Sequence, residues 1–425
     1  MTVETIDPAL APAVERLRAA GVGRRLVCVT GHGDVLGTFA HWREGRDEPR
    51  TPNTAYSAQL YDVARALGSD ALVLPADPAS TLDPVEVRGA RFAFRPLPLV
   101  EGTGWRYHAA AIAQARAITR AARQHRADLI IVQRGLLHAW PLIGARAGGM
   151  RVAISLHNTL WPLGLRPSRS RAWAGRLSGA LWNRVFDTTV VASDAIRRQL
   201  EETARGPIRN LHLQLPFYDP ARLGAPAARP AADGPAHVVF LGRIEHSKGV
   251  FTLVEAAERL IAAGRALRVS IAGDGAALGA LRETVARSPA AGAIDVMGRI
   301  DGEAVFALVD TADALACPTT PAFPEGFAMV VVEAWLKGVP VVASDVVPAA
   351  EHLPDGVVTH RAGDAASLAE GLARILDDRA TGGPLARRPP PADDRFTAPR
   401  LSLSSRLIDG LDIACHAPGS RPASA

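Results

Sequence analysis

The stretch PEGFAMVVVEAWLKGVPVVAS at residues 324–344 contains the succession of elements that decides the fold. It follows a short apolar run, DALACP at 313–318, which predicts a buried strand ending near Pro318. Residues 326–337 have the apolar spacing and length of a helix, and PVVAS at 340–344 predicts the next strand. A strand, a helix and a second strand in this order predict two parallel strands joined by a crossover helix.

The same alternation extends over most of the chain and predicts α/β structure, with parallel sheets covered by helices on both faces. Strands are predicted at 25–31, 71–75, 127–133, 151–158, 187–193, 237–242, 268–275, 294–298, 313–318 and 340–344. Helices are predicted at 54–68, 107–125, 168–184, 194–204, 250–263, 276–287, 326–337 and 366–378. Two Rossmann-like halves facing a cleft are the simplest account of this rhythm.

A change in composition separates the two halves. Residues 219–236 are rich in Pro, Ala and Gly, which is typical of a linker between domains. We therefore expect one domain over 1–218, a linker over 219–236 and a second domain over 237–381. Residues 382–425 are expected to form an irregular segment and a tail, and packing of this tail on the first domain is left open.

Bulk composition excludes several classes of protein. The chain has 425 residues, of which 48% are hydrophobic, and its N-terminus lacks the apolar core of a signal peptide. No apolar run reaches the roughly 18 residues that a transmembrane helix needs. Cys28, Cys317 and Cys415 are too few and too scattered for a disulfide framework or a zinc site, so a reducing cytoplasm is expected. The net charge of +5 suits anionic ligands, but a genome-wide bias toward Arg and Ala is the favoured explanation.

Two glutamates frame the central part of the 324–344 stretch. Glu325 is expected in the loop after a strand, at the sheet edge where α/β proteins bind ligands, and Glu333 in the helix. Gly326, Phe327, Ala328 and Met329 are expected to form the first helical turn, whose free N–H groups and dipole favour an anion. If the segment is helical throughout, about 12 Å of axial rise separates the two carboxylates. The alternative is a solvated Glu325 and a Glu333 paired with Lys337.

A second candidate segment is FLGRIEHSKGV at 240–250. A strand is expected to end at Gly242, with Arg243 and Lys248 in the following loop. Two cations five residues apart in such a loop can hold a diphosphate and stabilise it as a leaving group. The alternative is a solvated loop in which Arg243 pairs with Glu245.

The N-terminal half carries weaker signals. His157 lies at the end of a predicted strand, where it can bind a sugar or handle a proton, or serve a structural role. Gly31 and Gly33 after the first strand are candidates for a backbone nest near phosphates, although they lack the full dinucleotide-binding spacing. No Asp-x-Asp at a strand end indicates a metal site, so no metal ion is expected.

The two C-terminal segments together resemble motifs of retaining GT-B glycosyltransferase family 4, also called glycosyl transferases group 1. The family's E-x7-E motif has a Pro-Glu-x-Phe-Gly lead, and its phosphate loop reads Gly-Arg-x-x-x-x-Lys-Gly. The resemblance is good over 237–378 and weaker over 25–215. It implies that Glu325 contacts the donor sugar and Glu333 the ribose hydroxyls. Two departures affect the local loops: Ala328 replaces a glycine, and Val347-Pro348 replaces a Gly-Gly pair.

The resemblance implies transfer of a sugar from a nucleotide diphosphate donor to a glycan or lipid-linked acceptor, with retention of configuration and without a metal or other cofactor. The C-terminal half is expected to bind the donor and the N-terminal half the acceptor, and nucleic acid is not an expected partner. The alternatives are a nucleotide-sugar epimerase or hydrolase of the same fold, and a non-catalytic subunit that binds nucleotide sugars. The oligomeric state is left open.

A basic, tryptophan-containing segment at 161–184 permits peripheral contact with the inner face of a membrane. The alternative, which the pattern favours, is a helix at 168–184 whose apolar residues pack against the sheet while its arginines are solvated. That alternative buries Trp173, Leu177, Leu181 and Trp182.

Overall fold

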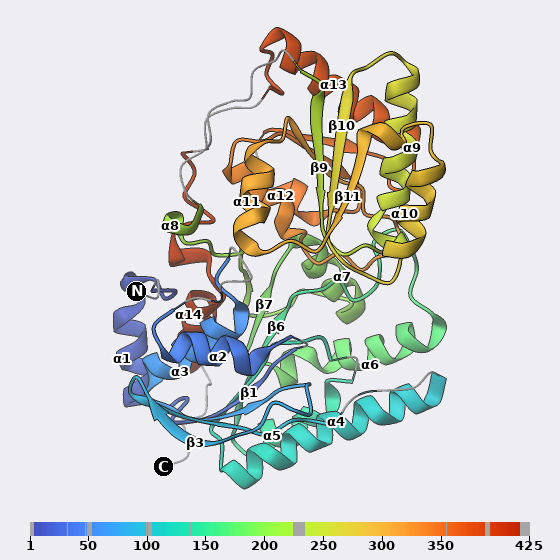
Figure 1. Cartoon of the computed structure of the whole chain (residues 1–425). Helices are drawn as coiled ribbons and strands as arrows, with labels where there is room; N and C mark the ends of the chain where they lie inside the picture. Colours follow the sequence, from blue (N-terminus) through green and yellow to red (C-terminus); the bar gives the residue numbers. More distant parts are fainter. Residues whose placement is uncertain are drawn as a thin grey trace. The chain divides into compact units, whose positions relative to one another are not determined.

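The computed structural model shows an α/β chain that divides into two compact units (Figure 1). The described residues are 4–31, 33–46, 48, 53–98, 100, 104–136, 138–223, 234–353, 355–386 and 392–416. The first unit comprises Met1–Leu160, Pro167–Asp219 and Arg395–Ala425, and the second comprises Trp161–Arg166 and Pro220–Asp394. The chain thus enters the second unit at the start of the expected linker, most of which, like the last nine residues, lies outside the described part.

The first unit is built on an eight-stranded sheet with the order β3-β4-β2-β1-β5-β6-β7-β8. All neighbouring strands are parallel except β3 and β4, an antiparallel pair that the sequence analysis did not predict. The strands are β1 (Arg25–Val29), β2 (Asp70–Leu74), β3 (Leu82–Val87), β4 (Ala90–Phe94), β5 (Leu129–Val132), β6 (Arg151–Leu156), β7 (Thr188–Val191) and β8 (Leu211–Leu213).

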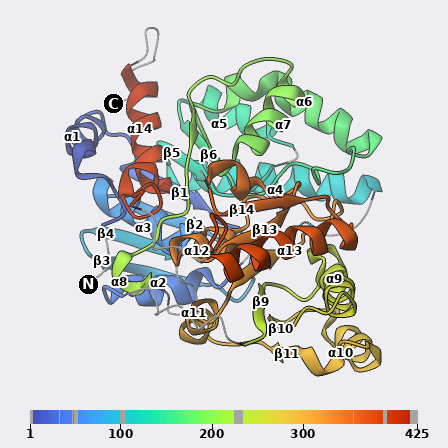
Figure 2. The same ribbon diagram turned by 90° about the horizontal axis from the view of Figure 1, so that it is seen from above.

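Helices cover both faces of this sheet, because successive strand residues point to opposite sides and each side is apolar. Within β1, Leu26 and Cys28 enter one core while Val27 and Val29 enter the other. The first face carries α1, α3 and α14, and the second carries α4, α5, α6 and α7 (Figure 2). These helices are α1 (Ala11–Ala19), α3 (Tyr56–Leu67), α4 (Gly104–His125), α5 (Ile143–Ala147), α6 (Arg169–Val185), α7 (Asp194–Ala204) and α14 (Leu403–His416).

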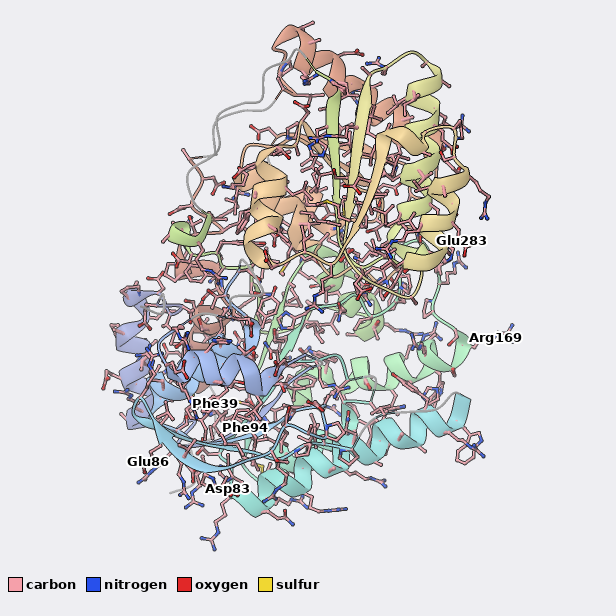
Figure 3. The ribbon with its side chains drawn as sticks, viewed as in Figure 1. Phe39, Asp83, Glu86, Phe94, Arg169 and Glu283 are labelled. Atoms are coloured by element: carbon pink, nitrogen blue, oxygen red, sulfur yellow. The ribbon has the colours of Figure 1, made fainter. Side chains whose placement is uncertain are left out.

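Aromatic packing fixes the antiparallel strand pair and the unpredicted helix α2 (Val35–Arg43) in the first unit. The rings of Phe39 on α2 and Phe94 on β4 lie 4.9 Å apart between centroids and point toward each other (Figure 3). Trp42 and Phe92 extend the cluster, with centroids 5.3 Å apart. The buried indole N–H of Trp42 donates to Asp62 at 2.9 Å, so the cluster also satisfies its polar atom.

The second unit contains a six-stranded parallel sheet with the order β11-β10-β9-β12-β13-β14. Its strands are β9 (Ala236–Leu241), β10 (Leu267–Ala272), β11 (Ile294–Gly298), β12 (Ala314–Cys317), β13 (Val341–Ser344) and β14 (Val357–His360). Its helices of eight or more residues are α9 (Val250–Ala262), α10 (Leu278–Arg287), α11 (Gly302–Asp310), α12 (Met329–Leu336) and α13 (Ala365–Thr381). The α/β class and the two parallel sheets are therefore confirmed, and β14 is an addition to the predicted strands.

The strand order of the second sheet reverses direction between β9 and β12. The connection after β9 leads to β10 on one side, and the connection after β12 leads to β13 on the other. Loops that diverge at such a switch point leave a crevice at the carboxyl ends of the strands. The two loops concerned are residues 242–249 and 318–328.

Gly249 holds these two loops together at close range. Its φ is +75°, and a Cβ at this position would lie 1.9 Å from the backbone oxygen of Pro318. Thr320 strengthens the junction, because its N–H and hydroxyl both donate to the carbonyl of Ser247, at 2.9 and 3.0 Å. The backbone of one loop therefore lies directly on the backbone of the other.

We predict that Gly249→Ala destabilises the fold much more than Gly264→Ala does. Both glycines have a left-handed φ, +75° and +82°, but a Cβ at Gly264 would meet nothing within 4 Å. Gly264→Ala should therefore show only the backbone strain of roughly 1–2 kcal/mol. Gly249→Ala adds a backbone clash and should lower the free energy of unfolding by about 2 kcal/mol more. Urea unfolding of both variants measures the difference, and equal losses would contradict the proposed close approach.

Candidate functional site

The two loops at the switch point of the second sheet bring Lys248 and Glu325 into direct contact. The ammonium Nζ of Lys248 lies 2.5 Å from Oε2 of Glu325, although the residues are 77 positions apart in the chain. Both side chains are largely buried. The pair joins the loop after β9 to the loop after β12, so two segments singled out separately in the sequence meet in one site.

The ring of Phe323 lies beneath both cations of this site. Nζ of Lys248 is 3.9 Å from the ring centroid, and Cζ of Arg243 is 5.0 Å from it. A cation over an aromatic face gains electrostatic stabilisation without being neutralised. Arg243 also pairs with Glu245 at 2.8 Å, as the alternative interpretation of this loop stated, but its side chain remains 59% exposed. Its guanidinium group is therefore near Lys248 and accessible from solvent.

Glu325 is buried rather than solvated, with 6% of its surface exposed, so the solvated alternative is wrong for this residue. The hydroxyl of Thr319 donates to the same Oε2 at 3.3 Å. Burial, followed by the charge of Glu325, raises the pKa of the Cys317 thiol to about 11. The carboxylate thus lies in a low-dielectric setting, where its interaction with Lys248 is stronger than it would be in water.

The helix after Glu325 begins later than predicted. Helix α12 starts at Met329, and Gly326, Phe327 and Ala328 precede it in extended or turn conformation. Ala328 has φ +73°, a left-handed value that an α-helix cannot include, so the expected first turn over Gly326–Met329 is wrong. The segment from Glu325 to Glu333 is therefore not helical throughout, and the axial rise of about 12 Å expected between these two carboxylates does not apply.

The strained position is the one where the resembling family has glycine. Glycine adopts a left-handed φ without a steric penalty, whereas alanine at this φ costs roughly 1–2 kcal/mol. The neighbouring carbonyl of Phe327 accepts a bond from the N–H of Ala349 at 2.9 Å, which ties the turn to residues 348–352. The surrounding loops thus hold Ala328 in a conformation that its side chain disfavours.

Glu333 lies on α12 and is buried. Lys337, its expected partner in the alternative interpretation, forms an ion pair with Asp310 at 3.2 Å. Gly242, at the end of β9, has φ +154° and accepts close contact, because a Cβ on Gly273 would lie 1.7 Å from its carbonyl oxygen. Gly242 is therefore closely packed against Gly273 at the end of β9, and Glu333 is enclosed on α12.

The N-terminal candidates lie in the first unit. His157 follows β6, where its Nε2 is 2.8 Å from Oγ of Ser155 and its Nδ1 is 3.4 Å from Nε2 of Gln214. Its ring packs on Tyr56 with centroids 4.1 Å apart. Burial lowers the pKa of His157 to about 3, so the imidazole is neutral at physiological pH. Both ring nitrogens have partners within the unit, as a structural histidine would.

The glycines after β1 leave room near a strand end. A Cβ on Gly31 would lie 3.5 Å from the carbonyl oxygen of Gln133, and a Cβ on Gly33 would meet nothing within 4 Å. His32 between them lies outside the described residues. The backbone around Gly31 is therefore close to the end of β5, whereas Gly33 is exposed.

Sequence reasoning missed Thr319 and Phe323 as parts of the site. Both lie in the loop between β12 and Glu325, and their side chains contact Glu325, Lys248 or Arg243. The sequence feature that could have identified them is their position in a loop that was already expected at the ligand-binding edge of the sheet. Their roles depend on a contact with a loop some 70 residues earlier, which no local pattern encodes.

No group of three or more His, Cys, Asp or Glu residues within the described part of the chain is arranged to hold a metal ion. The helices in the same residues include none with the length and apolar character to span a bilayer.

Among known protein families, the one described as "Glycosyl transferases group 1" has a model that matches residues 235–378. The glycogen synthase of Mycobacterium tuberculosis is 28% identical over 226 residues, which cover 50% of this chain and 54% of that protein. The phosphatidyl-myo-inositol mannosyltransferase of Mycobacterium leprae is 34% identical over 145 residues, 33% of this chain and 37% of that protein. The chain thus spans about half the length of the first of these relatives, and less of the second.

Solved structures resemble the chain over a greater length. A glycosyltransferase from Rickettsia africae has a TM-score of 0.61 at 14% identity, covering 92% of this chain and 97% of that one. The Anabaena protein Alr3699/HepE, solved with UDP and glucose, has a TM-score of 0.55 at 17% identity, covering 91% and 95%. Identities this low establish the fold alone, and the predicted GT-B fold is confirmed.

The environment of His157 predicts a pH dependence of stability. Its pKa is about 3 in the folded state and near 6.5 in the unfolded state, so the unfolded chain binds the extra proton. The contribution is complete above pH 6.5 and is lost as the pH falls, by up to about 2 kcal/mol between pH 7 and pH 5. Urea unfolding at the two pH values should show a smaller loss in His157→Gln than in the wild type. The exposed His416→Gln is the control, and equal pH dependence in all three proteins would contradict the assignment.

Proposed function

We propose that this chain, whose residues 235–378 match the model of the glycosyl transferases group 1 family, is a glycosyltransferase that uses a nucleotide diphosphate sugar. The observation that carries the proposal is the contact of Lys248 with Glu325 at the switch point of the second sheet. This contact joins the two segments that carry the family resemblance, at the edge where open α/β sheets bind ligands. The Anabaena protein Alr3699/HepE, which has a similar fold, was solved with UDP and glucose, and this supports a nucleotide sugar as the donor class.

In this proposal the diphosphate binds between the loop after β9 and the turn before α12. The exposed guanidinium of Arg243 exchanges its contact with Glu245 for a bidentate contact with phosphate oxygens. Lys248 supplies a second positive charge, and Phe323 holds both cations near the same point. Gly326, Phe327, Ala328 and Met329 contribute backbone groups toward the donor, and Glu333 binds the ribose hydroxyls.

Catalysis in this proposal rests on stabilising the departing diphosphate. The bond between the anomeric carbon and the diphosphate oxygen breaks, and the positive charges of Arg243 and Lys248 balance the charge that develops there. The acceptor hydroxyl attacks the face that the diphosphate leaves, and its proton passes to the departing phosphate oxygen. This course retains the anomeric configuration and requires neither a covalent nucleophile nor a metal ion. Glu325 contacts the donor sugar.

The first unit supplies the acceptor side in this proposal, with a glycan or lipid-linked acceptor. His157 is neutral near pH 7, so it can offer or accept a hydrogen bond to a sugar hydroxyl if it exchanges a present partner. Gly31 and Gly33 follow β1 at the carboxyl edge of the same sheet, and we assign their backbone N–H groups to a nest for phosphates. These roles are proposed from position and chemistry.

Two other functions are separated from this one by product analysis. A nucleotide-sugar epimerase or hydrolase of this fold would consume the donor when no acceptor is present. A non-catalytic subunit would bind the nucleotide sugar without turnover. The strained Ala328, which stands where the family has glycine, is the observation that supports this alternative. Calorimetry and a thermal-shift panel of nucleotide sugars, run beside a transfer assay, distinguish the three cases and identify the donor.

Peripheral membrane contact is a further part of the proposal, and charge supports it. Residues 102–186 contain thirteen arginines and one acidic residue, an excess of twelve positive charges in a chain whose total is +5. Trp105 and Trp173, near the starts of α4 and α6, are 74% and 66% exposed, so Trp173 does not pack on the sheet as the alternative required. Trp182 does pack there. The two helix starts lie side by side, linked by Arg171 over the ring of Tyr107 at 5.8 Å, and Arg169 projects outward (Figure 3).

We predict that Glu325→Ala and Arg243→Ala each lower the transfer rate by at least about tenfold, about 1.4 kcal/mol of transition-state stabilisation. Each removes a group that the proposal assigns to the donor site. The rates are measured with the donor that stabilises the protein in the thermal-shift panel. Arg287→Ala, which removes an exposed arginine at the end of α10, is the matched control and should retain wild-type activity. Unchanged transfer in either site variant would remove that residue from the mechanism.

We also predict that Trp105→Ala combined with Trp173→Ala weakens binding to vesicles containing about one-third phosphatidylglycerol by about tenfold, because each indole inserts at the interface. Sedimentation with the vesicles measures the bound fraction. Ile413→Ala removes an exposed apolar residue on α14, outside the basic segment, and should bind like the wild type. Equal binding of the wild type to neutral and anionic vesicles, or no binding to either, would contradict membrane contact.

A further inference from the structure

The first unit has a switch point of its own, and it contains polar groups that the donor site does not use. Its strand order reverses between β1 and β5. The connection after β1 leads to β2 on one side, and the connection after β5 leads to β6 on the other. Thr30 and Gly31 follow β1, and Gln133 and Arg134 follow β5. The N–H of Gln133 donates to the carbonyl of Val29 at 2.7 Å, so the two strand ends are adjacent. A ligand site is expected at such a point in this sheet as in the other.

Several buried polar atoms around this switch point have no hydrogen-bond partner among the described residues. Burying such a group without a partner costs roughly 1–3 kcal/mol, so each one is a candidate ligand contact. His138 is only 4% exposed, and Gln133 is buried as well. The unpartnered atoms are Oγ1 of Thr30, Nε2 of Gln133, Nη1 of Arg134 and Nδ1 of His138.

Tyr107 and His108, neighbours at the start of α4, link His138 in the loop after β5 to Arg171 on α6. Nδ1 of His108 is 3.0 Å from Nε2 of His138, and the ring of Tyr107 is 6.0 Å from that of His108. When His108 donates in this pair, the proton of His138 is on Nδ1, which then becomes a free donor. Arg171 on α6 lies over the Tyr107 ring at 5.8 Å. Burial lowers the pKa of Arg134, and Tyr107 partly offsets this effect.

The cluster is positively charged. Neither Arg134 nor Arg171 forms an ion pair with any residue in the described part of the chain. Residues 129–186 contain no Asp or Glu, so the segments that follow β5 and build α6 supply no carboxylate. The preceding acid, Asp128, accepts from the backbone N–H groups of Gly23 and Arg25 at the other end of β5. A partly buried guanidinium group without a counter-charge is costly unless an anion completes the site.

We propose that Tyr107, Arg134, His138 and Arg171 form a subsite in the first unit that binds one phosphate group. A phosphate offers more acceptor oxygens than a carboxylate, which suits donors that come from the β5 loop, α4 and α6. Its role in the reaction rests on the proposed function: in a glycosyltransferase, this subsite binds the phosphate group of a phosphorylated acceptor. The phosphate belongs either to a soluble phosphomonoester or to a lipid headgroup.

Isothermal titration with inorganic phosphate tests the subsite directly, in a protein that also carries Arg243→Ala so that the expected diphosphate site contributes less. We expect saturable binding of one phosphate, competition by glycerol 3-phosphate, and no competition by glycerol. Arg134→Gln should weaken binding at least tenfold, and Arg134→Lys should restore part of it. Arg120→Gln, an exposed arginine on α4, is the matched control and should change binding less than twofold.

Arg171→Gln provides a second test at an exposed position, where the fold does not depend on the side chain, and should weaken phosphate binding several-fold. Absence of saturable binding, or equal weakening by Arg134→Gln and Arg120→Gln in folded proteins, would overturn the proposal. Because the readout is phosphate binding and not sugar transfer, it is independent of whether the chain is a glycosyltransferase.

Vesicles distinguish the two sources of the phosphate. If a lipid headgroup enters the subsite, Arg134→Gln weakens binding to phosphatidic acid vesicles as well as to inorganic phosphate. If the ligand is soluble, the same variant loses phosphate binding but binds the vesicles like the wild type, because the exposed arginines and the two exposed indoles mediate contact with the surface without Arg134.

Discussion

The close contact between the loop after β9 and the loop after β12 is the constraint on which the donor site depends. Gly249 permits it, because any side chain there would collide with the backbone of Pro318. Once the backbones are in contact, Lys248 reaches Glu325 and both cations reach Phe323. Backbone packing therefore positions the loops that carry the positive charges expected to hold a diphosphate. Packed backbone atoms vary less in position than the ends of long, flexible side chains.

The two units use the same topological feature for different electrostatic arrangements. At the switch point of the second sheet, Lys248 and Arg243 each have a carboxylate partner, so a ligand must compete with Glu325 or Glu245. At the switch point of the first sheet, Arg134 and Arg171 have no carboxylate partner in the described residues. The first arrangement suits a ligand that binds and leaves as its charge changes, and the second suits a constant anionic group.

Long-range contacts explain which parts of the structure the sequence analysis missed. The strands at 237–242 and 313–318 were predicted from short apolar runs, because a strand buried on both faces needs such a run. The β3–β4 pair and helix α2 were not predicted, because their stability comes from contacts such as that of Phe39 with Phe94, which lie far apart in sequence. The start of α12 was misplaced because Ala328 gives no local sign of a left-handed backbone, which the neighbouring turn imposes.

The sequence by itself determined the α/β class, the two parallel sheets, and the identity of Glu325, Arg243 and Lys248 as donor-site candidates, since periodicity and motif spacing are local properties. Tertiary structure alone decided that Lys248 pairs with Glu325, that Arg243 pairs with Glu245, and that Trp173 is exposed. It also decided that Nη1 of Arg134 has no hydrogen-bond partner within the described residues. These outcomes depend on which distant segments become neighbours, because the free energy of a charge or an indole is set by its surroundings.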